Sequence, residues 1–376
     1  MADFTSALYL GLAHSSAALP GWEALTSGRP AALREPDGAN AVAAELARLQ
    51  GTAAAILLPS TLHLFWDLLR QFARQARTEL LLDAGTYPIL QWAADGAAAL
   101  GARVQCFAHH DAAALAPLAP LAQRAARDGL RPVVVCDGFC PGCNRAAPLH
   151  DYARIAAGHG GMLVLDDTQA LGVLGCAPSS HACPYGYGGG GSLRWHDLAS
   201  THIAVGASLA KGFGAPLAAL SGSAALIAGF RRDSETRLHC SPPSIAAVQA
   251  AHCALDAAAR SGQARRARLT RLVLSLRATL AANGLAAIGS LPFPVQSFVA
   301  RHTEDPEMLV HCLHRLRAGG VHALLTQGCA GRAPRLSFIV TARHTRAQID
   351  RVGELLARRT VATFTPAAVA TVMASR

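Results

Sequence analysis

Short apolar runs alternate with stretches of helical length between about residues 40 and 245, and this alternation limits the possible folds more than any other sequence feature. The intervening stretches include 87–100 and 149–159, whose apolar residues recur at helical spacing. Strands that alternate with helices in this way form a mainly parallel sheet with helices on both faces. We therefore predict an α/β fold with seven strands, at 53–59, 79–83, 103–107, 132–137, 162–166, 202–208 and 217–223.

A smaller α+β domain is predicted to follow. A long helical pattern covers 244–283, interrupted only at Ser261-Gly262. Shorter strand-like and helical runs come after it, with strands expected at 292–300, 321–326 and 335–341 and helices at 307–318 and 346–358. We expect residues 1–40 to form an N-terminal segment that packs with the small domain, and residues 41–245 to form the large domain. Residues 246–376 are expected to form the linking helix and the small domain.

The composition favours a cytoplasmic globular protein. Hydrophobic residues make up 51% of the chain and charged residues 15%, which argues against long disordered stretches. The first ten residues lack the basic and apolar pattern of a secretory signal. Polar residues interrupt the most apolar stretch, 52–69, so no membrane association is expected.

The net charge of +10 is the one compositional hint about a partner. Arginines gather in 264–277 at helical spacing, which is typical of a solvated helix face. No nucleic-acid-reading motif or interleaved aromatic residues accompany them, so nucleic-acid binding is not expected. Attraction of an anionic substrate, such as a coenzyme A thioester, is an equally simple explanation.

Ten cysteines are scattered along the chain, and we expect most of them to be reduced thiols. Cys140 and Cys143 form a C-x-x-C pair that is compatible with a redox pair or half of a zinc site. No second pair completes a tetrahedral set, so we expect a plain Gly/Pro-rich turn and no metal.

Two strand ends carry residues suited to chemistry. The apolar run 162–165 leads directly into Asp166 and Asp167, an unfavourable place for charge unless a cation meets it at the carboxyl edge of the sheet. In the segment 205–214, Lys211 lies among small and apolar residues, where desolvation would lower its pKa and favour imine formation. A helix cap and a surface lysine are the structural alternatives for these two segments.

Taken together, the motifs resemble those of the α-oxoamine synthase group of fold type I pyridoxal-phosphate enzymes, within the aminotransferase class I/II superfamily and with 8-amino-7-oxononanoate synthases as the best match. Asp166-Asp-Thr-Gln-Ala-Leu-Gly-Val-Leu-Gly175 is similar to the aspartate-rich strand end followed by G-V-x-G. Ser208-Leu-Ala-Lys-Gly-Phe-Gly214 is similar to the cofactor-lysine segment. Weaker similarity extends to 9–12, 107–111, 137–138, 147–149, 241–243 and 335–344, so the resemblance covers nearly the whole chain.

The resemblance implies a role for each matched residue. Lys211 would hold pyridoxal 5'-phosphate as a Schiff base and then act as general acid and base at the substrate α-carbon. Asp166 would pair with the pyridine nitrogen of the cofactor. Ser208 and the turn at Ser60 and Thr61 would bind the cofactor phosphate, as exposed N–H groups at a helix start can.

Several positions depart from the family pattern. Tyr87 and Gln169 stand where the group has histidines; tyrosine can still stack on the cofactor and glutamine can still donate to its phenolic oxygen, but neither delivers a proton near neutral pH. Pro141 replaces a serine, and Leu325 replaces the arginine that binds the substrate carboxylate. The nearby Arg332 is the candidate to replace that arginine.

Sites in this fold are built between two chains, so the resemblance implies a homodimer. His239 is the candidate for an approach to the phosphate in the partner subunit. The stretch 178–192 is inserted relative to the family and is expected to shape a different substrate pocket. Within 185–192, the glycines 188–191 are expected to form a mobile loop.

The predicted function is the condensation of an amino acid with an acyl thioester. An aminotransferase or other reaction at the α-carbon is the alternative, favoured by Tyr87 and Gln169. A non-catalytic dimeric scaffold is a third possibility, against which Lys211, Asp166 and Ser208 argue together. The sequence does not identify the amino acid or the acyl donor.

Overall fold

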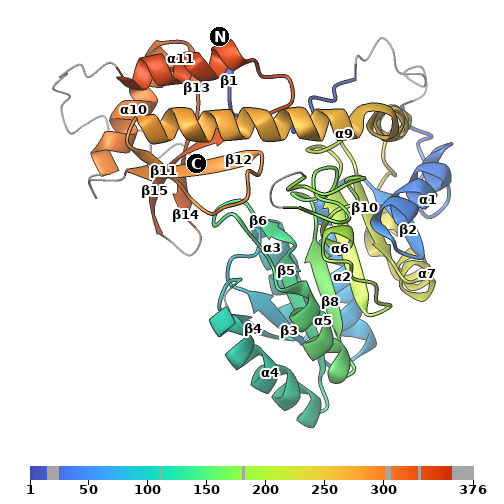
Figure 1. Ribbon diagram of the computed structural model, residues 1–376. Helices are drawn as coiled ribbons and strands as arrows, with labels where there is room; N and C mark the ends of the chain where they lie inside the picture. Colours follow the sequence, from blue (N-terminus) through green and yellow to red (C-terminus); the bar gives the residue numbers. More distant parts are fainter. Residues whose placement is uncertain (15–24, 111, 180–182, 301–305, 329–331, 358–376) are drawn as a thin grey trace. The chain divides into compact units, whose positions relative to one another are not determined.

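The computed structural model describes residues 1–14, 25–110, 112–179, 183–300, 306–328 and 332–357 (Figure 1). The chain divides into two compact units. The larger unit contains Leu10–Cys140 and Arg145–Arg266, and the smaller contains Met1–Tyr9, Pro141–Asn144 and the chain from Ala267 onward. The expected domain boundaries at residues 40 and 245 stay a prediction.

A seven-stranded sheet forms the centre of the larger unit, and all seven predicted strands are in it. Strand β10 is antiparallel to both neighbours, while the other neighbouring pairs are parallel. The predicted mainly parallel α/β fold is therefore confirmed. The strands, in their order across the sheet, are β2 (Ala54–Leu58), β10 (Ala218–Gly222), β9 (Ile203–Ser208), β8 (Met162–Asp166), β5 (Arg131–Asp137), β3 (Thr78–Asp83) and β4 (Arg103–Phe107).

Apolar clusters pack on both faces of this sheet. Leu80 and Leu82 of β3 belong to one cluster and Leu81 to the other, because successive strand residues point to opposite faces. One cluster includes residues of α2 (Thr61–Gln75), α3 (Pro88–Ala98) and α7 (Ala224–Asp233), and the other includes residues of α4 (Ala112–Arg127), α5 (Leu149–Gly158) and α6 (Ser192–Trp195). Burial on both faces explains why the strands read as continuous apolar runs rather than alternating ones.

The start of α2 is fixed by its sequence. Ser60 is its N-cap, with Oγ accepting the His63 N–H at 3.4 Å. Five apolar residues of this helix recur one turn apart and enter the core: Leu64, Phe65, Leu68, Leu69 and Phe72.

Four further elements and the start of a fifth complete the larger unit. They are α1 (Ala39–Gln50), α8 (Glu235–His239), a hairpin of β6 (Phe139–Cys140) and β7 (Arg145–Ala146), and the first part of α9 (Ile245–Ala282). The sequence predicted an interruption of α9 at Ser261-Gly262, which is wrong: the helix is continuous there, and Ser261 Oγ donates to the Ala257 carbonyl at 2.9 Å.

The sequence predicted that the arginines of 264–277 form a solvated helix face. In the structure, several of them instead form hydrogen bonds to backbone carbonyls. Arg265 donates to the Leu10 carbonyl, and Arg266, only 3% exposed, donates to the Gly172 carbonyl. Further along, Arg268 and Arg277 donate to other loop carbonyls. These guanidinium groups satisfy buried loop backbone, so much of the positive charge in this run is structural.

The smaller unit contains the predicted α+β elements. Its four-stranded antiparallel sheet has the order β11 (Leu285–Ala287), β12 (Val295–Ala300), β15 (Arg332–Ile339) and β14 (Leu324–Gly328). The helices are α10 (Pro306–Ala318), α11 (Arg346–Ala357) and the last part of α9. A separate parallel pair joins β1 (Ala2–Asp3) to β13 (Val321–His322), which brings the N-terminal residues into this unit.

Among the described residues, no helix combines the length and the apolarity needed to cross a membrane. The cysteines in the same part of the chain are thiols, including Cys140 and Cys143.

Candidate active site

The carboxyl ends of adjacent parallel strands bring the main site residues together. Asp137 at the end of β5 is the register partner of Asp166 at the end of β8, and Asp166 is in turn the partner of Gly206 in β9. Lys211 follows shortly after the end of β9, and its amine interacts electrostatically with both carboxylates. Lys211 and Asp166 are therefore close enough to influence each other's charge, while the cofactor roles expected of them stay predictions.

Lys211 is the only lysine in the sequence, whereas arginine supplies every other basic side chain apart from histidine. Burial lowers the pKa of its amine, while Asp166 and Asp137 oppose that shift. Its Nζ lies 5.9 Å from the centre of the Tyr87 ring. An amine whose charge is disfavoured by burial, next to an aromatic face, is suited to nucleophilic attack on a carbonyl.

Asp166 is 7% exposed, and burial raises the pKa of its carboxyl group. Its Oδ1 accepts the Thr168 N–H at 2.9 Å. This hydrogen bond and the charge of Lys211 both lower the pKa of Asp166 and so oppose the effect of burial. Because a buried charge is costly alone, a cationic partner such as a protonated ring nitrogen would stabilise this carboxylate. The residues present thus fit a cofactor with both an aldehyde and a basic ring.

The turn after β8 is joined to the end of β9. The Ser208 N–H donates to Thr168 Oγ1 at 2.9 Å, and Ser208 Oγ accepts the Ala210 N–H at 3.3 Å. Gln169 is half-buried in the same turn after β8. These contacts place Ser208 and Gln169 on the two turns that carry Asp166 and Lys211.

Gly212, next to Lys211, is required by the packing of two turns. A Cβ at Gly212 would overlap the Leu171 carbonyl oxygen, and a Cβ at Gly172 would lie 3.2 Å from the Gly212 Cα. Gly172 also has a φ of +88°, which L side chains rarely adopt. The two glycine motifs are therefore needed so that the two turns can pack against each other.

Ser60 and Thr61 lie at the same edge of the sheet as Ser208, one strand further along from β10. Strand β2 runs in the same direction as β9, because both are antiparallel to β10. Ala218 of β10 is the register partner of both Leu58 and Ser208. The start of α2 and the Ser208 turn thus lie at one edge, on either side of β10.

The described contacts do not test the two predicted substrate residues, Arg332 and His239. Arg332 begins β15 in the smaller unit, where its backbone pairs with Gly328, and its side chain lies outside the described part of the structure. His239 is the exposed last residue of α8 and lies near Glu235. Their roles stay predictions.

Sequence reasoning missed Asp137. Its carboxylate is buried beside Asp166, and its Oδ1 accepts the Tyr87 N–H at 3.3 Å. The signal was available, since the run 132–137 ends on an aspartate just as 162–166 does. Behind it, Asp83 at the end of β3 pairs with His109 Nδ1 at 2.5 Å.

The glycine-rich segment 185–192, predicted to be a mobile loop, forms one side of a hydrogen-bonded hairpin with 171–176. Gly172 N–H donates to the Gly189 carbonyl and Gly191 N–H to the Leu174 carbonyl, both at 2.8 Å. Asp167 joins the hairpin to the site strand by accepting the Ser192 N–H at 3.0 Å. Burial raises the pKa of Asp167 to about 7.

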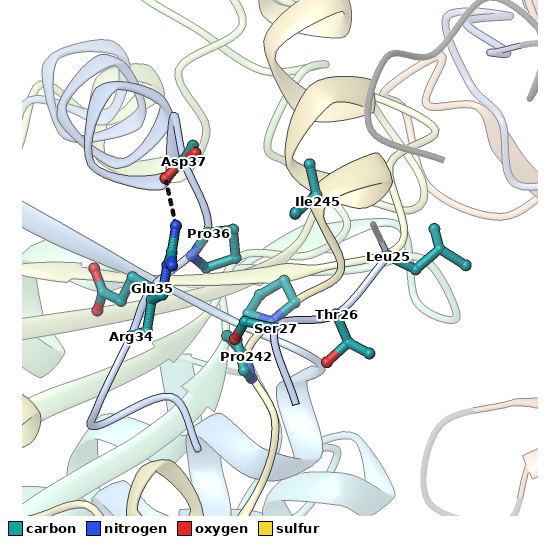
Figure 2. A pocket seen from close by; sticks show the side chains of 10 residues that line it. Leu25, Thr26, Ser27, Arg34, Glu35, Pro36, Asp37, Pro242 and Ile245 are labelled. Atoms are coloured by element: carbon teal, nitrogen blue, oxygen red, sulfur yellow. Dashed lines mark ion pairs between the residues drawn. The ribbon is translucent and has the colours of Figure 1, made fainter. Parts of the chain in front are cut away.

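A pocket of about 200 Å³ in the larger unit is separate from these residues (Figure 2). Figure 2 shows an ion pair between Arg34 and Asp37 at its rim, with N–O at 3.8 Å. None of the predicted site residues lines it. The lining residues are Leu25, Thr26, Ser27, Arg34, Glu35, Pro36, Asp37, Pro242, Pro243 and Ile245.

Residues 8–352 match the family model described as aminotransferase class I and II. An 8-amino-7-oxononanoate synthase from Thioalkalivibrio sulfidiphilus is 30% identical over 262 residues, which cover 69% of this chain and 62% of the relative. A putative 8-amino-7-oxononanoate synthase from Bordetella bronchiseptica is 31% identical over 326 residues, covering 84% of this chain and 75% of that protein. The chain thus spans less than two thirds of the length of the first of these relatives.

Solved structures share the fold at lower identity. A serine palmitoyltransferase from S. paucimobilis with a bound pyridoxal-phosphate–myriocin adduct has a TM-score of 0.76 at 19% identity, covering 94% of this chain and 86% of that one. An 8-amino-7-oxononanoate synthase from Francisella tularensis has a TM-score of 0.72 at 17% identity, covering 95% and 96%.

Proposed function

Because the chain belongs to the aminotransferase class I and II family, we propose that it is a pyridoxal-phosphate-dependent transferase that condenses an amino acid with an acyl thioester. The observation that carries this proposal is the sole lysine of the chain, a buried amine next to the Asp166 carboxylate. Arginine serves wherever a cation is needed, but a guanidinium is protonated at all relevant pH values and does not form imines. Lysine is retained at the one position that needs an amine.

Specific residues would hold the cofactor. Lys211 would bind its aldehyde, Asp166 its ring nitrogen, and Ser208 with the start of α2 its phosphate. The Tyr87 ring, 5.9 Å from Nζ, would cover one face. When bound, pyridoxal phosphate supplies a protonated ring that accepts the electron pair released at an amino-acid α-carbon.

The protein's own residues would control the proton and the charge. Burial lowers the pKa of the Lys211 amine and so favours its neutral form, which can take a proton from the α-carbon and return it. Asp166 keeps a negative charge opposite the ring nitrogen. Arg332 is proposed to bind the substrate carboxylate.

Acyl-thioester condensation is supported by the relatives named 8-amino-7-oxononanoate synthase. Tyr87 and Gln169 favour the alternative, an aminotransferase or other reaction at the α-carbon, because neither side chain replaces a histidine as a proton donor. A non-catalytic scaffold is disfavoured, since a scaffold gains nothing from a desolvated amine beside a carboxylate. We further propose a cytoplasmic homodimer, in which the exposed His239 approaches the partner's cofactor phosphate.

The first experiment asks whether Lys211 carries the cofactor. The protein loaded with pyridoxal phosphate is reduced with borohydride and then digested with a lysine-specific protease, which has one target in this chain. The reduced adduct should block the cleavage that occurs in the unreduced protein, and a Lys211→Arg variant treated in the same way should show no adduct mass by mass spectrometry. Labelling of any group other than Lys211 would contradict the assignment.

The second experiment separates the reactions. The loaded protein is mixed with single amino acids, with and without acyl-coenzyme A thioesters. Release of free coenzyme A that requires an amino acid supports condensation. Conversion of the bound cofactor to its pyridoxamine form without thioester supports transamination instead.

A further inference from the structure

Two carboxyl groups share the edge of the sheet next to Lys211. Asp137 and Asp166 are register partners on adjacent parallel strands, and they are 9% and 7% exposed. The Lys211 amine is a charge neighbour of both. Two buried carboxylates on adjacent strand ends, with one neighbouring amine to share, cannot both ionise without a large cost.

The hydrogen bonds to the two groups differ. Asp166 accepts the Thr168 N–H at 2.9 Å and is also bonded to the side chain of Thr168. Asp137 accepts only a longer bond, 3.3 Å from the Tyr87 N–H, among the bonds described for its carboxylate. Because bonds donated to a carboxylate favour its ionised form, the negative charge is better stabilised on Asp166.

The charges that face Asp137 from other elements do not reverse this preference. Asp83 and Asp166 disfavour its ionisation, and so does burial, which together raise its pKa well above the ordinary value. Cys136 is a further titratable neighbour. His109 and Lys211 act in the other direction, but His109 is paired with Asp83 and Lys211 is shared with Asp166.

We propose that Asp137 is a positioning residue that holds the proton of this carboxyl pair, so that the negative charge stays on Asp166, and that anchors Tyr87 at the start of α3. A protonated carboxyl group still offers Oδ1 to the Tyr87 N–H. Tyr87 is the first residue before α3 and its ring faces the lysine amine, so this anchor fixes the aromatic face of the site. The proposal concerns the proposed cofactor site, but its tests use protein without cofactor and do not depend on the reaction.

Infrared difference spectroscopy tests the proton directly. At slightly alkaline pH, where Asp167 with its pKa of about 7 is mostly ionised, the C=O stretch of a protonated carboxyl group should be present in the wild-type protein, absent in Asp137→Asn, and retained in Asp166→Asn. Asp167→Asn is the matched control, because Asp167 is a buried carboxyl group on the same strand end that bonds to Ser192 instead. A band that survives in Asp137→Asn and disappears in Asp166→Asn, or no such band in the wild type at slightly alkaline pH, would overturn the proposal.

Hydrogen exchange tests the anchor. The Tyr87 amide should be protected to a similar degree in the wild type and in Asp137→Asn, since asparagine keeps an acceptor oxygen. In Asp137→Ala its exchange should be at least about tenfold faster, because a bond of about 1.4 kcal/mol corresponds to a factor of ten. Equal protection in the alanine variant would show that Asp137 does not hold Tyr87. Exchange at amides of β9 reports separately on whether each variant is folded.

Discussion

Replacing Asp166 with asparagine should weaken the binding of pyridoxal phosphate without unfolding the protein. The asparagine side chain would keep an oxygen for the Thr168 N–H, the 2.9 Å bond that orders the turn after β8. The substitution would remove the charge opposite the ring nitrogen in a site where the side chain is almost fully buried. Breaking a buried ion pair by removing one partner costs about 3–5 kcal/mol. We expect the lower end, because the amide still offers a dipole.

That free energy corresponds to about a hundredfold increase in the dissociation constant, at about 1.4 kcal/mol per factor of ten. Protein freed of cofactor is titrated with pyridoxal phosphate and followed by the visible absorbance of the bound form. Asp167→Asn is the control, because its carboxylate bonds to the Ser192 N–H rather than to Lys211. The reasoning is refuted if Asp166→Asn binds within about threefold of the wild type, or if the control loses as much affinity.

Three other predictions concern stability and pH. Gly191→Ala should lower the free energy of unfolding by more than about 2 kcal/mol, since the φ of Gly191 is +86° and a Cβ would overlap Asp167 Oδ2. Denaturant titration measures this loss, and an unchanged unfolding midpoint would contradict the prediction. The pKa of Asp167 in the folded protein is about 7, above its unfolded value, so the wild type should lose stability as pH rises from about 4 to 7. Asp167→Asn should remove this part of the pH dependence of the melting temperature, and parallel wild-type and variant curves would contradict the assignment. Glu79→Gln should destabilise the folded protein by about 3 kcal/mol, because the buried Glu79 carboxylate forms ion pairs with both Arg103 and Arg124. A double-mutant cycle with Arg103→Gln should show coupling between the two substitutions, and fully additive free energies would contradict the prediction.

The sequence was informative where burial on both faces of a sheet dictated composition. The strand 162–166 was predicted with the bounds that the structure has, because its buried apolar run ends at two carboxylates. The single predicted strand 321–326 is in fact β13 and β14, which belong to different sheets. No periodicity reveals such a change of partner within a few residues.

The sequence singled out two of the charged residues that meet at this edge of the sheet, and it missed their neighbour Asp137. Lys211 and Asp166 were accessible because charge in an apolar setting needs an explanation. Asp137 was overlooked because its partners, Tyr87 and Asp166, come from distant parts of the sequence and meet only through strand order. The packing of Gly172 against Gly212 could not be predicted for the same reason, since each contacts atoms of the other turn.

The antiparallel strand β10 determines the width of the proposed phosphate site. It separates β2 from β9, so the turns that follow these two strands are two inter-strand spacings apart, about 10 Å. A purely parallel sheet with β2 next to β9 would bring Ser60 and Ser208 to about half that separation, too close for an anion to fit between the turns. One reversed strand therefore acts as a spacer that makes room for a ligand.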